Sequence, residues 1–202
     1  MNRLPLHLAT GNAHKAREMQ ALADASGLQV SVVAAAAMPA VAEDTGTFAG
    51  NARKKAYALL PLLLPDAWVL ADDSGLGVDA LGGAPGVESA YFAGPAGDGA
   101  ANLHKLTEAM RNVPPERRGA HFICVLALVT PAHGELLFEG RCDGALAMAP
   151  AGGNGFGYDP LFVPTGCTQT YAELGDAEKC QLSHRARAWG RLAEWLRPRL
   201  PA

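Results

Sequence analysis

The stretch Ala67-Trp68-Val69-Leu70-Ala71-Asp72-Asp73-Ser74-Gly75 joins an apolar run to two adjacent acids. The apolar residues, partly β-branched and aromatic, predict a buried strand that stops where the acids begin. Ligands of open α/β sheets gather beyond the carboxyl ends of the strands, where paired acids hold a divalent cation or move a proton. A functional site is therefore the first hypothesis. A simple turn before Gly75 explains the same residues equally well when the stretch is taken alone.

Length and charge limit the classes of protein that fit this chain. With 202 residues it is long enough to bury a large core, and we expect residues 1–202 to form a single domain. Apolar residues make up 49% and charged residues 18%, as in ordinary globular proteins. The net charge of −3 gives no broad basic surface that could follow a nucleic-acid backbone. We therefore expect a small-molecule substrate and no nucleic-acid partner.

Four cysteines, Cys124, Cys142, Cys167 and Cys180, lie far apart, with no C-x-x-C pair and no histidine at zinc-ligand spacing. They predict reduced, mostly buried thiols. The chain begins without a basic segment followed by a long apolar one, and no uncharged apolar segment reaches about 18 residues. These features predict a cytoplasmic protein that does not contact a membrane.

The hydrophobic pattern predicts strands and helices that alternate first and mostly strands later. Turn residues at 10–12 separate a first strand from a first helix, and Thr47 and Pro61 mark the beginning and end of a second helix. We expect an α/β fold with a mixed central sheet flanked by helices. The predicted strands cover residues 4–9, 29–34, 67–71, 76–81, 121–130 and two segments around Gly140 within 135–148; the predicted helices cover 13–25, 47–60, 101–110 and a last one from Ser183.

The segment Thr10-Gly11-Asn12-Ala13-His14-Lys15 links the first strand to the first helix. Unpaired backbone N–H groups at such a junction form an anion site. Lys15 in the first turn opposes the helix dipole, so a bound phosphate would explain it better than an empty site. A plain turn with a solvent-facing lysine is the alternative, and by itself the segment favours that alternative.

Ser183-His184-Arg185 places positive groups at the positive end of the last helix dipole. Ser183 is a good N-cap, but His184, Arg185 and Arg187 break the usual charge preference there. Such breaks tend to mark functional sites. The alternative is that the arginines bend outward into water.

A glycine-rich segment runs Gly152-Gly153-Asn154-Gly155-Phe156-Gly157-Tyr158-Asp159-Pro160. Its glycines would allow the backbone to approach a flat ligand, on which Phe156 or Tyr158 could stack. Asp159 could accept a hydrogen bond from a ring N–H. Asn154-Gly155 by itself more often forms a hairpin turn.

Glu43 and Asp44 precede Gly46 in a polar loop. One of them could add a carboxylate to a metal held by Asp73. A solvated pair of loop acids is a strong alternative.

Together these segments resemble the Ham1-like inosine/xanthosine triphosphate pyrophosphatases, and the resemblance spans almost the whole chain. It implies an elongated α/β fold with two lobes around a nucleotide-binding cleft, a homodimer, and Mg²⁺-dependent release of pyrophosphate and a nucleoside monophosphate from ITP, dITP or XTP. The segments that carry it, in the family's order, are 9–18, Thr47-Phe48 with Asn51-Ala52, 70–76 leading to 81–86, 155–162, 172–174 with Glu178-Lys179, and Ser183-His184-Arg185.

The resemblance also implies roles for particular residues. Asp73 would be the general base and a metal ligand, and Ser74 would touch the substrate. The second metal ligand would be Glu43, although the family usually has two acids, two intervening residues and then Thr-Phe. Gly50 departs from the glutamate of many relatives. The phosphates would be held by Thr10, Gly11, Asn12, Ala13, His14 and Lys15, and the base by Phe156, Gly157, Tyr158, Asp159, Lys179, His184 and Arg185.

The hypothesis that follows is that Asp73 or Asp72 positions a water for attack on the α-phosphorus while Lys15 and a metal stabilise the leaving pyrophosphate. Donors on Lys179, His184 and Arg185 would favour the carbonyl groups of deaminated purines over amino groups. The alternatives are a Maf-like pyrophosphatase with another base preference and a nucleotide-binding module without catalysis.

Overall fold

The computed structural model describes residues 3–200, which form one six-stranded sheet and six α-helices. The strand order is β2-β1-β3-β4-β5-β6; β1 runs parallel to β2 and β3, and β5 runs antiparallel to β6. The predicted mixed α/β fold is therefore confirmed. The strands are β1 (Leu4–Ala9), β2 (Val30–Ala34), β3 (Trp68–Val78), β4 (Gly119–Thr130), β5 (Gly134–Leu146) and β6 (Phe162–Pro164). The helices are α1 (Ala13–Ala25), α2 (Phe48–Leu59), α3 (Gly99–Ala109), α4 (Tyr171–Leu174), α5 (Asp176–Leu182) and α6 (His184–Leu196), with short 3-10 helices at Leu60–Leu62, Asp79–Leu81, Gly86–Tyr91, Pro115–Arg117 and Arg197–Arg199.

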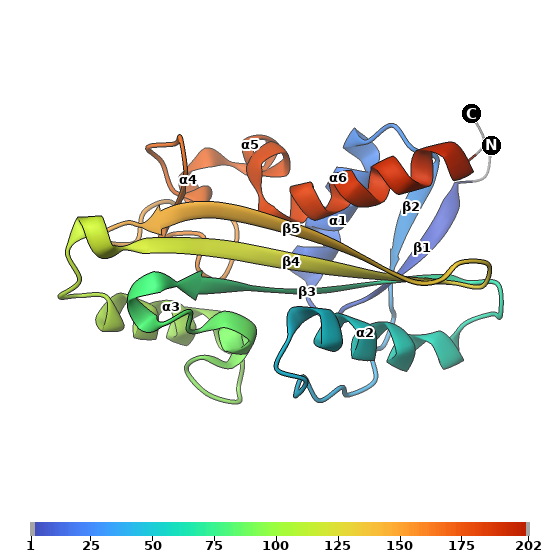
Figure 1. Cartoon of the computed structure of the whole chain (residues 1–202), viewed down its shortest axis with the longest axis horizontal. Coiled ribbons are helices and arrows are strands. Elements are labelled where there is room, and N and C mark those ends of the chain that lie inside the picture. Colours follow the sequence, from blue (N-terminus) through green and yellow to red (C-terminus); the bar gives the residue numbers. More distant parts are fainter. Residues whose placement is uncertain (1–2, 201–202) are drawn as a thin grey trace. The chain divides into compact units, whose positions relative to one another are not determined.

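Two compact units divide the chain. The first unit holds the residues up to Asp73, Cys124–Gly140 and the residues from Arg185 onward; the second holds Ser74–Ile123 and Arg141–His184. Strands β3, β4 and β5, labelled in Figure 1, each contribute residues to both units. Whether residues 1–202 act as a single domain stays a prediction.

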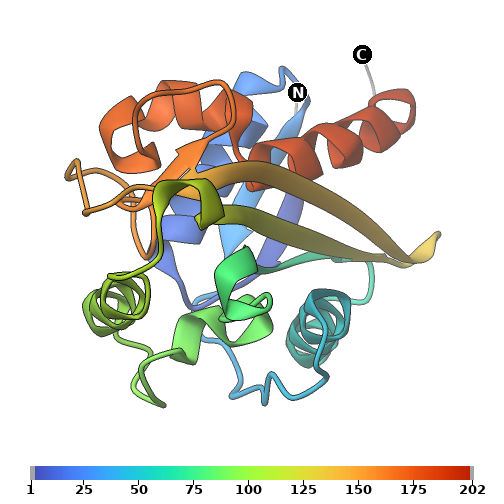
Figure 2. The ribbon, with the colours of Figure 1, turned by 60° about the vertical axis from the view of Figure 1, so that its left-hand side comes forward.

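The first unit surrounds the parallel strands β1 and β2 and the beginning of β3. Leu6 and Leu8 of β1 are fully buried, and α1 packs against β2. Helices α2 and α6 lie on opposite sides of the strands of this unit in both ribbon views (Figures 1 and 2). Both α1 and α2 begin at side-chain caps, because Asn12 accepts from the first turn of α1 and Thr47 from that of α2.

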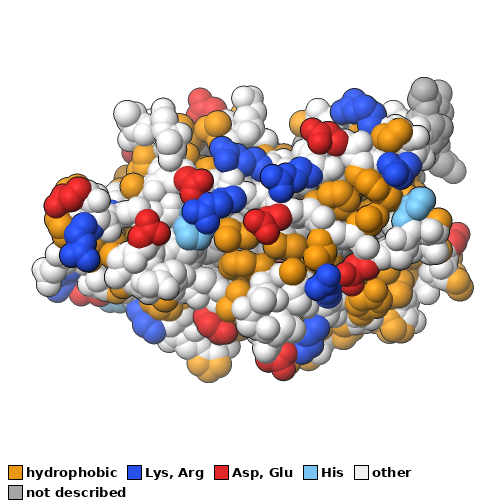
Figure 3. Space-filling model, viewed as in Figure 1, with side chains coloured by type: hydrophobic (Ala, Val, Ile, Leu, Met, Phe, Trp, Pro, Cys, Tyr) orange, Lys and Arg blue, Asp and Glu red, His pale blue; other side chains and the backbone are white. Residues whose placement is uncertain are grey.

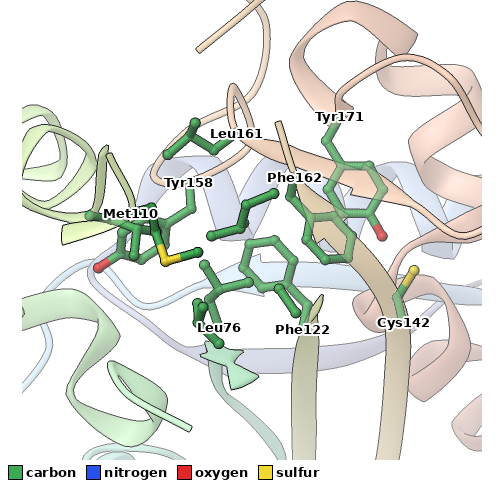
Figure 4. Packing of buried hydrophobic residues seen from close by; sticks show 12 residues of the cluster. Leu76, Met110, Phe122, Cys142, Tyr158, Leu161, Phe162 and Tyr171 are labelled. Carbon is green, nitrogen blue, oxygen red and sulfur yellow. The ribbon is translucent and has the colours of Figure 1, made fainter. Parts of the chain in front are cut away.

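The core of the second unit is built around Phe122 of β4 (Figure 4). Its ring meets Phe162 edge-on with centroids 4.9 Å apart, and Tyr171 stacks on it at 5.9 Å. Leu106 and Met110 near the end of α3 join the same cluster. Aromatic contacts of this geometry stabilise beyond the area they bury, so this cluster fixes where β4, β6 and α4 meet.

The paired acids do not end their strand, so that part of the sequence prediction is wrong. β3 continues through Asp72 and Asp73 to Val78, and the expected strand at 76–81 is its last part followed by a 3-10 turn. The neighbouring strand β1 pairs with β3 only as far as Ala9 opposite Ala71. The acids therefore lie just past the end of the parallel pair, although the strand itself goes on.

Other boundaries also differ from the sequence prediction. β5 is one strand through Gly140 instead of two segments, and the short helices α4 and α5 were not predicted. Helix α3 begins at Gly99, two residues early, because the Asp98 carboxylate accepts from the N–H groups of Ala100 (2.8 Å) and Ala101 (3.2 Å). A side-chain cap of this kind fixes where a helix begins more strongly than the hydrophobic pattern does.

The four cysteines are free thiols; two are buried and two are partly exposed. Across the described part of the chain, residues 3–200, no helix has both the length and the apolar character needed to cross a membrane. On the face drawn in Figure 3, Lys and Arg side chains lie among Asp and Glu side chains. That face carries side chains of both charge signs.

Arg118 is buried in the second unit with only 2% of its surface exposed. Its guanidinium donates to four backbone carbonyl groups: Leu146 (2.8 Å), Met110 (2.7 Å), Val113 (3.1 Å) and Ala147 (2.7 Å). Met110 and Val113 follow α3, whereas Leu146 and Ala147 lie at the end of β5. Arg118 thus joins the end of α3 to the end of β5.

Arg118→Met should lower the free energy of unfolding by about 3 kcal/mol, because it leaves buried carbonyls without donors. The measurement is the urea unfolding curve followed by circular dichroism. The matched control is Arg117→Met at the exposed neighbour, which should change stability by less than about 0.5 kcal/mol. Equal effects of the two substitutions would contradict this role of Arg118.

Candidate active site

Asp72 joins side chains from both ends of the chain within the first unit. Its Oδ1 lies 2.5 Å from Lys15 Nζ, and its Oδ2 accepts from Arg185 Nε at 2.9 Å and from the Cys124 thiol at 3.1 Å. Arg185 Nη1 also donates to Glu18. Burial by itself raises the pKa of Asp72, but the charges of Arg185 and Lys15 outweigh it and hold that pKa well below its usual range. Asp72 therefore stays ionised although no part of its side chain is exposed.

Asp73 and Glu43 share one cation, the ammonium of Lys55 on α2. Lys55 Nζ lies 2.6 Å from Asp73 Oδ1 and 2.7 Å from Glu43 Oε2. Burial raises the pKa of Asp73 to about 6, with a smaller contribution from Glu43, although Lys55 and Lys15 oppose the shift. Burial also favours the neutral form of Glu43, but Lys55 lowers its pKa below the ordinary value. The Asp73 carboxylate is thus more basic than that of an ordinary aspartate. Glu43, with its lowered pKa, is ionised at neutral pH.

The loop that carries Glu43 is tied to the first turns of α2. Asn51 Oδ1 accepts from the backbone N–H (3.2 Å) and hydroxyl (2.8 Å) of Thr45, and Thr47 caps the helix by accepting from Gly50 N at 3.0 Å. A Cβ on Gly50 would lie 2.3 Å from Thr45 Oγ1. A larger residue at position 50 would therefore need Thr45 to move.

A divalent metal fits the pair Glu43 and Asp73. The second carboxyl oxygen of Asp73, Oδ2, is buried and finds no hydrogen-bond partner in residues 3–200. The same residues contain no group of three or more metal-ligating side chains. Mg²⁺ commonly takes one or two carboxylates and completes its shell with water and substrate phosphates. A site with two acids, one of them with an unsatisfied oxygen, therefore suits Mg²⁺, which completes its shell with water and phosphate. It suits less well a metal that takes protein ligands alone.

The junction before α1 is capped more completely than the sequence predicted. Asn12 Oδ1 accepts from the backbone N–H groups of His14 (2.9 Å) and Lys15 (3.2 Å), and Thr10 Oγ1 accepts from Asn12 N at 3.1 Å. The expectation that these N–H groups are unpaired is therefore wrong. Lys15 is explained by its ion pair with Asp72 even without a phosphate. Gly11 and Ala13 are exposed, and a Cβ on Gly11 would meet nothing within 4 Å.

In the second unit, Asp159 is buried against Lys179, whose Nζ lies 2.6 Å from Asp159 Oδ2. The same oxygen accepts from Phe156 N at 2.9 Å, and the Phe156 ring lies 5.0 Å from Lys179 Nζ. Gly155 has φ +74°, and a Cβ there would lie 2.1 Å from Asp159 Oδ2. Gly155 therefore serves the close approach of the loop to Asp159, and close approach of a flat ligand is not needed to explain this glycine.

Two aromatic side chains near this loop are held by the core. The Tyr158 ring belongs to the core cluster, and its hydroxyl donates to Ser89 O at 2.8 Å. Of Phe156 and Tyr158, the two rings expected to stack on a flat ligand, Phe156 is the one that lies half-buried outside that cluster. His184 is buried and stacks on Phe122 with centroids 4.6 Å apart and the planes 10° from parallel. Ser74 is half-buried on β3, directly after Asp73.

The predicted residues therefore fall into two sets, one in each compact unit. The first unit holds those at the N-terminal junction with Glu43, Asp73 and Arg185; the second holds Ser74, the Phe156–Asp159 segment, Lys179 and His184. The alternative in which the arginines bend into water is wrong for Arg185, which is 1% exposed, and right for the exposed Arg187.

Sequence reasoning gave no role to Lys55, Glu18 or Cys124. Lys55 follows Asn51 by four residues, so the two lie on the same face of α2. That spacing was the available signal, since Asn51 already stood out in the sequence. The Cys124 contact had no local signal, because 52 residues separate Cys124 from Asp72.

The fold and site define a mixed α/β protein with a cluster of acids and cations on its central strand. The Ham1 family model matches residues 6–195. A dITP/XTP pyrophosphatase of Opitutus terrae is 56% identical over 199 residues, which cover 95% of this chain and 98% of that protein. A dITP/XTP pyrophosphatase of Streptomyces coelicolor is 46% identical over 95% of this chain and 96% of its own length. The structure of a HAM1 protein from Coxiella burnetii superposes with a TM-score of 0.82 at 36% identity, covering 96% of this chain and 99% of that one. The chain belongs to the Ham1 family.

Asp72→Asn should lower the free energy of unfolding by about 3 to 5 kcal/mol, because it leaves Lys15 and Arg185 without their buried anion. Urea unfolding at pH 7 measures the loss. Asp66→Asn, at an exposed acid, is the control and should stay within about 0.5 kcal/mol of the unsubstituted protein. A loss no larger than that of the control would show that the ion pairs do not stabilise the fold.

The same variant gives a pH dependence of known sign. The pKa of Asp72 is lowered by folding, so its contribution is complete above the unfolded value of about 3.9 and is lost as the pH falls toward the lower folded value. The stability difference between the unsubstituted protein and Asp72→Asn should therefore be constant from about pH 7 to 5 and shrink below about pH 4. A difference that grows on acidification would contradict the assigned ionisation.

Proposed function

We propose that this chain hydrolyses non-canonical purine nucleoside triphosphates (dITP, XTP and ITP) to the nucleoside monophosphate and pyrophosphate. Such an enzyme is a nucleoside triphosphate pyrophosphatase, which is a hydrolase. The observation that carries the proposal is the cluster on β3, where Asp72 holds Lys15 and Arg185 while Asp73 and Glu43 face one cation position. The names of the relatives support the same substrate class.

Asp73 is the proposed general base, positioning a water for attack on the α-phosphorus. Its pKa of about 6 suits a base that works near neutral pH, because the carboxylate is then mostly ionised yet still accepts a proton. Glu43 and Asp73 would hold Mg²⁺, which when bound neutralises phosphate charge. Lys15 is held at 2.5 Å by Asp72 and keeps two further N–H donors for the leaving pyrophosphate.

Base recognition is assigned to the second unit. Lys179 and His184 offer donors that would pair with the carbonyl groups of a deaminated purine and leave an amino group unpaired, and Phe156 offers a half-buried ring for stacking. Arg185 was expected to read the base as well. Because its guanidinium already donates to Asp72 and Glu18, we assign it the role of holding Asp72.

Assembly as a homodimer in the cytoplasm belongs to the same proposal. Assays with ITP, dITP, XTP, GTP and dTTP, with both products identified, separate this activity from that of a Maf-like pyrophosphatase. Absence of any turnover would indicate a nucleotide-binding module.

Asp73→Asn should lower kcat for XTP by about 10² to 10⁴-fold, because the amide cannot accept the proton of the attacking water. Pyrophosphate release measures turnover, and the thermal midpoint shows that the variant is folded. Asp44→Asn changes an exposed acid of the same loop that pairs with Lys54 and should retain kcat within about threefold. Turnover of Asp73→Asn close to that of the control would refute the role of Asp73.

Lys179→Met should reduce the preference for XTP over GTP, measured as the ratio of kcat/KM values, by about tenfold or more, since a donor to the base carbonyl is lost. The exposed Lys105→Met is the control of equal charge change. An unchanged ratio, with both kcat/KM values lowered together, would remove Lys179 from base selection.

A further inference from the structure

Lys55 occupies a position that an acid pair would otherwise offer to a metal. Its side chain is 12% exposed, and its ammonium lies within 2.7 Å of one oxygen from each of Glu43 and Asp73. No other cationic side chain in residues 3–200 forms an ion pair with either carboxylate. The two acids on which the proposed metal site depends are thus bridged by a cation that belongs to the chain itself.

We propose that Lys55 is an internal substitute for the divalent cation, and that metal binding to Glu43 and Asp73 displaces its ammonium. The inference rests on the metal site of the proposed function and adds a regulatory step to it. Without nucleotide, the protein should bind free divalent metal weakly, because the metal must first break the ion pairs of Lys55 with Glu43 and Asp73.

Electrostatics makes the two states exclusive. A metal that binds both carboxylates at about 2.1 Å would lie within a few ångströms of Nζ, where a divalent and a monovalent cation repel strongly in a site of low dielectric constant. Lys55 has a flexible four-carbon stem that allows the ammonium to move without moving α2. Its Nζ already lies 3.5 Å from the backbone carbonyl of Asp72, which shows that acceptors other than the two carboxylates lie within its reach.

The displaced ammonium needs a new anion, and the substrate provides one. A nucleoside triphosphate that arrives with its metal brings phosphate oxygens, which lysine binds as a point charge. Metal and nucleotide should therefore bind together much more tightly than either alone. This coupling keeps the acids covered until a complete substrate is present.

The adjacent lysine supplies a matched control. Lys54 lies on the same helix, and its Nζ lies 2.5 Å from Asp44 Oδ1, with 38% of the side chain exposed. Removing its charge changes the net charge of the protein by the same amount as removing that of Lys55. It does not uncover Glu43 or Asp73.

The experiment compares Mn²⁺ binding to unsubstituted protein, Lys55→Met and Lys54→Met by electron paramagnetic resonance, without nucleotide. Lys55→Met should bind Mn²⁺ at least about tenfold more tightly than the unsubstituted protein, and Lys54→Met within about twofold of it. The gain should be lost in the double variant Lys55→Met/Glu43→Gln. Equal or weaker Mn²⁺ binding by folded Lys55→Met would overturn the proposal.

A second measurement does not depend on that variant folding. Amine labelling of the unsubstituted protein, read by mass spectrometry, should increase several-fold at Lys55 with saturating Mn²⁺ and stay constant at Lys54. Protection or no change at Lys55 would overturn the proposal. Neither readout involves catalysis, so the proposal can fail while XTP hydrolysis is observed, and the proposed function can fail while metal displaces Lys55.

Discussion

The ion pairs of Asp72 with Lys15 and Arg185 are the contacts on which the first unit depends. The carboxylate lies on the central strand β3, and its two partners come from the first turns of α1 and α6, 170 positions apart in the chain. Burying an unpaired carboxylate would cost several kcal/mol. Here every charge in the group has an opposite charge at hydrogen-bond distance, and the Cys124 thiol, whose pKa is raised by burial and by Asp72, stays protonated and donates as well.

The alternation of side chains along a strand explains how two adjacent acids acquire different properties. Neighbouring residues of β3 point to opposite faces of the sheet, so Asp72 meets α1 and α6 while Asp73 meets Lys55 on α2. The first carboxylate is held ionised by two cations. The second, beside Glu43 and with one buried oxygen unsatisfied, has its pKa raised to about 6 by burial. One strand therefore presents a paired, ionised carboxylate on one face and a carboxylate of raised pKa on the other.

Much of this arrangement could be predicted from the sequence, and the rest could not for physical reasons. Hydrophobic periodicity gave β1, α1, β4 and α6, and the capping signal of Thr47 gave α2. Periodicity failed at β3, because two acids inside a strand are tolerated only when distant cations neutralise them, and no local pattern reveals such partners. It also failed at β5, where Gly140 reads as a break although it is buried within a continuous strand. Most candidate site residues, among them Lys15, Asp73 and Arg185, were indicated by their own sequence context, and the resemblance assigned their roles. Lys55, Glu18 and Cys124 are identified only by contacts between elements distant in sequence.

A double-mutant cycle between Asp72 and Arg185 tests this central interaction most directly. Stability would be determined for Asp72→Asn, Arg185→Met and the combined substitution, so that the coupling energy separates the ion pair from the loss of packing. We expect a coupling of about 2 kcal/mol or more, because either single change removes the close contact between the Asp72 carboxylate and the Arg185 guanidinium. Additive effects, with a coupling below about 0.5 kcal/mol, would mean that the two ends of the chain are not joined through Asp72.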